Sequence, residues 1–123
     1  IYGDTGCGIS LGAYVIKKAG IHSAGPYHIP NIRVDTYTLY TNNPVSGAIR
    51  GFGVLQAAVA HEVQMDRLAH KLGISPLDFR LINCLKPGLT SSTGQEMNEG
   101  CGIEATLERI KDYMKDHNLG FKI

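Results

Sequence analysis

The stretch Gly47–Gln56 reads GAIRGFGVLQ and stands directly before an alanine-rich run that is typical of a helix. It places one cation, Arg50, and one aromatic ring, Phe52, among glycines. Glycine fills a core poorly, but it permits positive φ and close backbone approach, and it leaves main-chain N–H groups free to meet an anionic or polar ligand. The residue pattern therefore marks this stretch as the segment built for a ligand.

Two interpretations of this loop follow from its residues. In the first, Arg50 offers a planar, always-ionised fork to a phosphate or carbonyl oxygen, and Phe52 presents an unshielded ring face to a flat substrate. In the second, Phe52 fills the local core and Arg50 pairs with Glu62 or Asp66. Composition alone leaves both interpretations open.

A long helix is predicted after the loop, over about residues 55–72, because alanine, leucine, methionine and glutamine dominate it. Gly73 is a natural terminator. At 100° per residue, Glu62 and Asp66 fall inside the apolar arc of this helix, where two unpaired carboxylates would be costly. They need cationic or N–H partners, and Arg80 is the candidate for that structural role.

Two further helices are predicted. The first has Ser75 as its N-cap, Pro76 at the first helical position and Asp78 as the third residue of a capping box, and it runs to about Leu85. The last covers about residues 103–117. Its charged residues are expected on a solvated face: Glu104, Glu108, Lys111 and Lys115.

Upstream of the loop, the sequence predicts a short helix near residues 13–19 and a strand over about 32–41, which is rich in β-branched and aromatic residues. A single strand cannot satisfy its own hydrogen-bond ladder. Either the glycine-rich N-terminal segment pairs with it, or its partner strands lie outside the chain. The predicted fold class is α+β: a glycine-rich N-terminal segment and one or two strands, followed by about three helices.

Composition narrows the classes of function. The 123 residues are 43% hydrophobic and 19% charged with a formal net charge of +1, which favours a globular protein and predicts neither nucleic acid nor a membrane as partner. The three cysteines show no Cys-x-x-Cys spacing and the five histidines form no close pair, so no metal site is predicted. Reduced cysteines favour an intracellular, cytoplasmic protein.

Several motifs occur together in a fixed order between about Asp4 and Gln95. They are GPYHIPN, TNNP, GAIRGFGVLQ, a helix containing EVQMD, then SPLDFR followed by an asparagine. In this order the series resembles the molybdenum-cofactor-binding subunit of the xanthine dehydrogenase/aldehyde oxidase family, where each motif alone would be a weak signal. The resemblance implies that the chain is an internal fragment of a larger molybdopterin-binding domain, with a strand-containing part over 1–46 and the cofactor loop and helices over 47–123.

The resemblance also implies roles for individual residues. Ala48, Ile49 and Arg50 take the positions that line the molybdopterin, and Phe52 takes the position that packs against a planar substrate. Ile49 departs from the second phenylalanine of the xanthine enzymes, so a purine substrate is not implied. Lys18 falls near a substrate-orienting arginine of those enzymes.

Members of this family hydroxylate a carbon of an N-heterocycle or aldehyde with oxygen from water, and pass electrons to 2Fe-2S clusters and FAD on other domains or subunits. Their catalytic glutamate lies in a Gly-x-Gly-Glu motif that this chain lacks. The resemblance thus implies part of a multi-subunit enzyme, inactive alone and without a catalytic residue of its own, whose pterin is molybdopterin or its cytosine dinucleotide form. The alternative is a non-enzymatic module that binds a small ligand or a partner chain.

Overall fold

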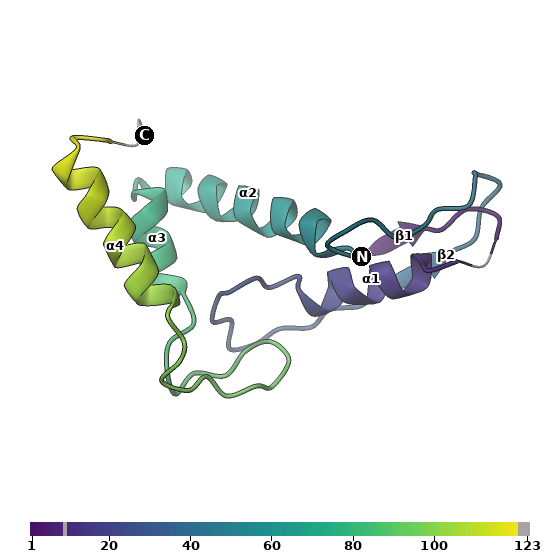
Figure 1. The fold of residues 1–123 in the computed structure, drawn as a ribbon, viewed down its shortest axis with the longest axis horizontal. Helices are drawn as coiled ribbons and strands as arrows, with labels where there is room; N and C mark the ends of the chain where they lie inside the picture. The colour runs from purple at the N-terminus through teal and green to yellow at the C-terminus, as the bar shows by residue number, and fades with distance from the viewer. Residues whose placement is uncertain (9, 121–123) are drawn as a thin grey trace. The chain divides into compact units, whose positions relative to one another are not determined.

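The computed structural model describes residues 1–8 and 10–120 (Figure 1). The elements follow the order β1 (Tyr2–Asp4), α1 (Gly12–Ile21), β2 (Tyr37–Leu39), α2 (Val54–Leu72), α3 (Pro76–Asn83) and α4 (Ile103–Asp116). The predicted α+β class, with strands followed by helices, is confirmed. The chain forms two compact units, one of residues 1–25 and 31–61, the other of residues 26–30 and 62 onward. The expected division after residue 46 stays a prediction.

In the first unit, β1 and β2 pair in parallel with Tyr2 opposite Tyr37, Gly3 opposite Thr38 and Asp4 opposite Leu39. The N-terminal segment therefore supplies the partner strand, which was one of the two expected alternatives. The strand predicted over 32–41 is only three residues long, because β1 offers three residues to pair with and a ladder cannot exceed its shorter strand.

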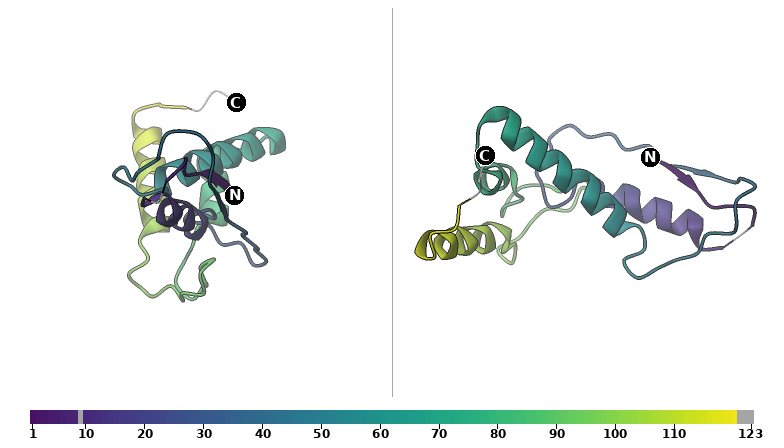
Figure 2. Two further views of the ribbon diagram at one scale, coloured as in Figure 1. Left: turned by 90° about the vertical axis from the view of Figure 1, so that its right-hand side faces the viewer. Right: turned by 90° about the horizontal axis from the view of Figure 1, so that it is seen from above.

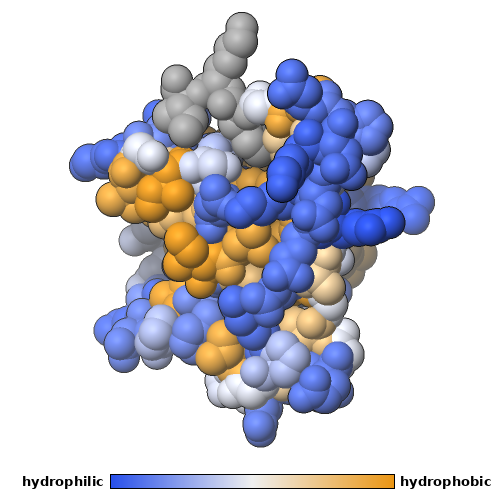
Figure 3. Space-filling view, turned by 90° about the vertical axis from the view of Figure 1, so that its left-hand side faces the viewer, coloured by the Kyte–Doolittle hydropathy of each residue, from blue (hydrophilic) through white to orange (hydrophobic). Residues whose placement is uncertain are grey.

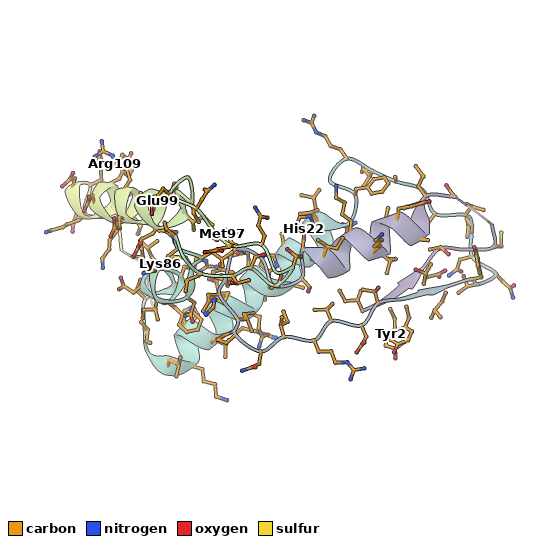
Figure 4. The ribbon with its side chains drawn as sticks, turned by 90° about the horizontal axis from the view of Figure 1, so that it is seen from below. Tyr2, His22, Lys86, Met97, Glu99 and Arg109 are labelled. Atoms are coloured by element: carbon orange, nitrogen blue, oxygen red, sulfur yellow. The ribbon has the colours of Figure 1, made fainter. Side chains whose placement is uncertain are left out.

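Helix α1 covers one face of this strand pair, and its bounds extend the predicted helix at both ends. A Cβ at Gly3 would come within 2.0 Å of the Ile16 side chain, so a larger residue there would force Ile16 to move. Tyr2 and Tyr37 stack with their ring centroids 5.0 Å apart. Figure 4 shows Tyr2 on the side of the strands away from α1. Because side chains alternate along a strand, Gly3 and the tyrosines face opposite ways.

Helix α2 begins one residue before its predicted start and ends as predicted, at Leu72. Its end is a glycine-terminated turn: Gly73 has φ 68°, and the N–H of Ile74 donates to the carbonyl of Ala69 at 3.0 Å. None of the helices within residues 1–8 and 10–120 is both long and apolar enough to cross a bilayer.

Helix α3 starts at Pro76, as predicted, but ends at Asn83 rather than Leu85. Cys84 is extended and forms an antiparallel bridge with Tyr27, while the N–H of Leu85 donates to the carbonyl of Pro26 at 2.9 Å. Residues 84 and 85 therefore pair with the 26–30 segment instead of continuing the helix. Tyr27, Cys84 and Leu85 are all buried and lie in the core of the second unit with Ala69 and Leu77.

The predicted capping box at the start of α3 is wrong, because Ser75 makes no side-chain cap hydrogen bond. Asp78 instead accepts a hydrogen bond from Lys111 of α4 at 2.7 Å. The charged face of α4 is likewise only partly solvated, since Glu104 pairs with Lys86. These two ion pairs join α4 to α3 and to the segment after it, and the two helices lie side by side (Figures 1 and 2).

Helix α4 buries none of its residues. Of its apolar residues, Ile103, Leu107 and Met114 are half-buried, and Ile110 and Tyr113 are exposed. Figure 3 looks onto the side that carries α4 and shows apolar surface bordered by hydrophilic residues.

Candidate functional site

The loop between β2 and α2 projects its residues into solvent. Residues 47–51 are all exposed, with Ile49 at 69%. Two overlapping turns shape the loop: the N–H of Phe52 donates to the carbonyl of Ile49, and the N–H of Val54 donates to the carbonyl of Gly51, each at 3.0 Å. Among residues 1–8 and 10–120, the N–H groups of residues 48–51 find no backbone or side-chain acceptor.

Three consecutive residues at the end of this loop have positive φ. Phe52 has φ 51°, between Gly51 at 94° and Gly53 at 93°. A bulky residue in this conformation is uncommon and costs about 1–3 kcal/mol. Gly51 and Gly53 on either side adopt positive φ without strain, as the sequence predicts. Nothing lies within 4 Å of a Cβ placed at Gly47, so its surroundings are open.

Gly53 makes the close approach that its sequence pattern indicates, but its neighbour is a helix. It is buried, and a Cβ there would lie 2.2 Å from the carbonyl oxygen of Val15 and 3.1 Å from the amide nitrogen of Ala19, both in α1. The end of the loop is therefore held against the α1 backbone. The contact gives Gly53 a structural role, and it fixes the backbone next to Phe52.

Phe52 is half-buried and lines a cavity of about 210 Å³ on the surface of α1. The other lining residues come from two successive turns of that helix: Tyr14, Lys17, Lys18 and Ile21. The ring thus borders an open cavity instead of filling a core. The structure also brings Lys18 next to Phe52. Sequence reasoning placed Lys18 near a substrate-orienting position but did not include it among the site residues.

The spacing of residues 14, 17, 18 and 21 was the available signal for this arrangement. Positions three and four apart share one face of a helix. What the spacing could not show is that this face turns toward Phe52.

Arg50 is exposed, and within the described part of the chain its side chain has no hydrogen-bond or ion-pair partner. Glu62 and Asp66, the partners that the second interpretation gave to Arg50, both bind Arg80. Arg80 Nη2 lies 2.7 Å from Glu62 Oε2, and Nη1 lies 2.7 Å from Asp66 Oδ1.

Arg80 is the centre of a half-buried network, as predicted. Besides the two carboxylates, it donates to the carbonyls of Pro76 at 3.1 Å and Glu62 at 3.3 Å. The hydroxyl of Tyr27 donates to the Glu62 carboxylate at 2.8 Å. Burial, followed by this hydrogen bond to Glu62, raises the pKa of Tyr27. Burial alone would lower the pKa of Arg80, but its hydrogen bonds to Asp66 and Glu62 raise it above the ordinary value.

The loop fits an anionic, oxygen-rich group. Its unengaged N–H groups and the free guanidinium of Arg50 are donors suited to phosphate and carbonyl oxygens. Among residues 1–8 and 10–120, no three His, Cys, Asp or Glu side chains come together in a way that could hold a metal ion.

Comparison with known proteins confirms the resemblance. The profile of the molybdopterin cofactor-binding domain matches residues 1–84, which include the whole loop. The nicotinate dehydrogenase large molybdopterin subunit of Eubacterium barkeri is 48% identical over 91% of this chain and 26% of that subunit. The aldehyde oxidoreductase of Megalodesulfovibrio gigas is 49% identical over 66% of this chain and 9% of that protein.

Solved structures agree with the sequence relatives. The aldehyde oxidoreductase from Desulfovibrio desulfuricans matches 95% of this chain with a TM-score of 0.83 at 29% identity, and this match uses 13% of that enzyme. The chain thus spans only a small part of the length of each relative.

Proposed function

The chain belongs to the family of molybdopterin cofactor-binding domains, and we propose on this premise that it forms one wall of the cofactor site of a molybdenum hydroxylase. The observation that carries the proposal is the loop of residues 47–53, in which residues 47–51 are exposed. It lies within the family match, and the described residues leave the Arg50 guanidinium and the N–H groups of residues 48–51 unengaged. Donors held ready in this way are what a phosphate- and carbonyl-bearing cofactor requires.

Within this proposal, Ala48, Ile49 and Arg50 face the pterin. Arg50 holds an oxygen of the cofactor through charge-assisted hydrogen bonds, and the main-chain N–H groups beside it add neutral ones. Phe52 presents its ring to a planar substrate and keeps water from one side of it. The bound molybdenum cofactor supplies the redox chemistry by which a substrate carbon is hydroxylated. The catalytic glutamate would come from outside this chain.

The substrate class we propose is a planar N-heteroaromatic ring that carries a carboxylate. Phe52 offers a flat apolar surface, and Lys17 and Lys18 line the same cavity with two ammonium groups that attract an anion. Ile49 makes two-sided aromatic clamping of a purine unfavourable. The Eubacterium barkeri relative is named for nicotinate, which is such a molecule. An uncharged aldehyde would make no use of the lysines.

The remaining parts of the enzyme are proposed to lie outside residues 1–123. These are the rest of the molybdenum subunit and domains or subunits with 2Fe-2S clusters and FAD. In keeping with the sequence expectation, the pterin is either molybdopterin or its cytosine dinucleotide form. A cytoplasmic location belongs to the same proposal, with the three free thiols as its support.

The test is to express the complete reading frame that contains this chain, and to measure its molybdenum and pterin. Oxidation of nicotinate is then compared with that of unsubstituted pyridine, xanthine and benzaldehyde. We expect bound molybdenum and a preference for nicotinate. A subunit without molybdenum and pterin would overturn the enzymatic proposal and favour the ligand-binding module.

Two variants separate the roles of the cavity residues. Phe52→Ala should weaken substrate binding while pterin is retained. Lys18→Met should raise the KM for nicotinate about tenfold, the effect of losing one charge-assisted contact of about 1.4 kcal/mol, and leave pyridine oxidation unchanged. Loss of pterin in Phe52→Ala would reassign that residue to the cofactor. An equal effect of Lys18→Met on both substrates would exclude a role in recognising charge.

A further inference from the structure

One motif of the ordered series, TNNP at residues 41–44, has no role in the site described above. Two of its side chains, those of Thr41 and Asn43, donate hydrogen bonds to Asp4, near the N-terminus. Asp4 Oδ1 accepts a hydrogen bond from Thr41 Oγ1 at 2.7 Å and from the N–H of Gly6 at 2.8 Å. Asp4 Oδ2 accepts one from Asn43 Nδ2 at 2.5 Å. The carboxylate thus binds three donors from two segments that lie about 40 residues apart in sequence.

Backbone hydrogen bonds join the same two segments. The N–H of Thr41 donates to the carbonyl of Gly6 at 3.1 Å, the N–H of Cys7 to Asn43 at 3.0 Å, and the N–H of Ser46 to Thr5 at 3.1 Å. We call residues 4–7 and 41–46, joined in this way, the Asp4 clasp. The clasp extends beyond Asp4 and Leu39, the last residues that pair in the β1–β2 ladder.

The two segments of the clasp are closely packed, so neither has much freedom to slide past the other. A Cβ at Gly6, whose φ is 75°, would lie 2.1 Å from the carbonyl oxygen of Pro44. The polar donors keep the Asp4 carboxylate ionised, because the hydrogen bonds from Thr41, Gly6 and Asn43, in that order, lower its pKa. Hydrogen bonds to a charged acceptor are stronger than neutral ones.

The clasp ends at Ser46, directly before the loop. Residues 47–52 are therefore held at one end by the clasp and at the other by Gly53, which packs against α1. Between these two points residues 47–51 are exposed, and among residues 1–8 and 10–120 the backbone hydrogen bonds of the loop are those of its own turns. Fixing both ends of a short loop reduces the entropy that a ligand must remove when it binds.

We infer that Asp4 is a positioning residue for the molybdopterin loop: it holds the Thr41–Pro44 turn and so presents Ala48, Ile49 and Arg50 in their binding arrangement. Asp4 does not touch the cofactor in this scheme. The inference rests on the proposed function, because it assigns the loop to the pterin. It adds a role for the TNNP motif and for the glycine-rich N-terminal segment.

The experiment compares Asp4→Asn, Asn43→Asp and the double variant in the complete subunit. In Asp4→Asn, the amide oxygen can still accept from Thr41 and Gly6, and the Asn43 amide has to turn over to accept from the new NH2 group, so the charge-assisted hydrogen bond becomes a neutral one. In the double variant, the amide at position 4 donates to a carboxylate at position 43, which restores the pair with its polarity exchanged. Asp35→Asn is the matched control, since Asp35 belongs to the same unit and its side chain, among the described residues, pairs only with the exposed Arg33.

The readouts are pterin per folded subunit and the hydrogen exchange of the amides of Cys7, Thr41 and Ser46. We expect Asp4→Asn to hold pterin about tenfold more weakly, the loss of one charge-assisted hydrogen bond, and to exchange these amides faster. The double variant should recover both properties, and the control should resemble the wild type.

Unchanged exchange and unchanged pterin in Asp4→Asn would overturn the inference, as would a double variant no better than the single one. If Asp4→Asn does not fold, a double variant that folds and binds pterin still supports the inference, and a double variant that does neither overturns it. If the wild-type subunit itself carries no pterin, the proposed function fails. The exchange rates then decide separately whether Asp4 orders the segment before the loop.

Discussion

Arg50 and Arg80 have the same side chain and opposite surroundings. Arg80 donates to Glu62, to Asp66 and to a carbonyl of its own helix, and only 18% of its side chain is exposed. Arg50 is exposed and, among the described residues, makes none of these contacts. A guanidinium whose donors are all engaged contributes to folding. One whose donors are left open contributes little to folding and has them available for a ligand.

The largest loss of stability is expected at the point that anchors the loop. Gly53→Ala should lower the free energy of unfolding by about 3 kcal/mol or more, because it combines an unfavourable φ with a Cβ only 2.2 Å from Val15 O. Gly73→Ala is the control, since its φ is also positive but nothing lies within 4 Å. It should cost about 1 kcal/mol. Equal losses in denaturant unfolding would show that the contact with α1 is not tight.

Removing the engaged arginine should have the next largest effect. Arg80→Ala removes the guanidinium that binds two half-exposed carboxylates and should cost about 2–3 kcal/mol in urea unfolding. Arg33→Ala is the matched control, because its pair with Asp35 is solvated, with 86% of the arginine side chain exposed. That change should stay within about 0.5 kcal/mol. Similar values for the two variants would contradict the assignment of Arg80 to the fold.

The same network predicts a dependence on alkaline pH. The pKa of Tyr27 is raised in the folded state above its ordinary value of 10.0. The contribution of Tyr27 to the free energy of unfolding is therefore fully present below pH 10. It is lost as pH rises further, because the tyrosine of the unfolded chain releases its proton first. The slope of unfolding free energy against pH should approach about −1.4 kcal/mol per pH unit from this group. Tyr27→Phe should remove that part of the slope, and an unchanged slope would exclude Tyr27 as its source.

The smallest effect on stability is expected at the free arginine. Arg50→Ala should change the free energy of unfolding by less than about 0.5 kcal/mol, as for other exposed sites without partners. In the complete subunit, pterin content or turnover should nevertheless fall by at least about tenfold, because a charge-assisted contact is lost. A variant that unfolds while its folded fraction keeps full activity would make Arg50 a structural residue.

Sequence reasoning reached the elements whose causes are local. The composition and terminator of α2 predicted both of its ends to within one residue, and Pro76 marked the start of α3. The pairing of Arg80 with Glu62 and Asp66 could be predicted because the buried arc of one helix carried two charges that had to be neutralised. The loop at residues 47–53 was recognisable from its glycines.

Other features depend on segments that are distant in the chain. Sequence reasoning extended the strand beyond Leu39 and Tyr37 because it could not know how few residues β1 would offer. The local sequence predicted Asp78 as a capping residue, but in the structure it accepts a hydrogen bond from Lys111 of α4. Lys18 joins Phe52 because the buried Gly53 brings the loop onto α1, a contact between residues more than 30 positions apart.

By itself, the sequence determined the helices, the family and the loop that carries Arg50 and Phe52, because periodicity, turn chemistry and short motifs act over a few neighbouring residues. Only the tertiary structure decided which arginine is engaged in the fold, that Gly53 packs against a helix, and that Asp4 binds the TNNP turn. Those outcomes depend on which distant groups meet, and a hydrogen bond or a steric contact exists only when both partners are in place.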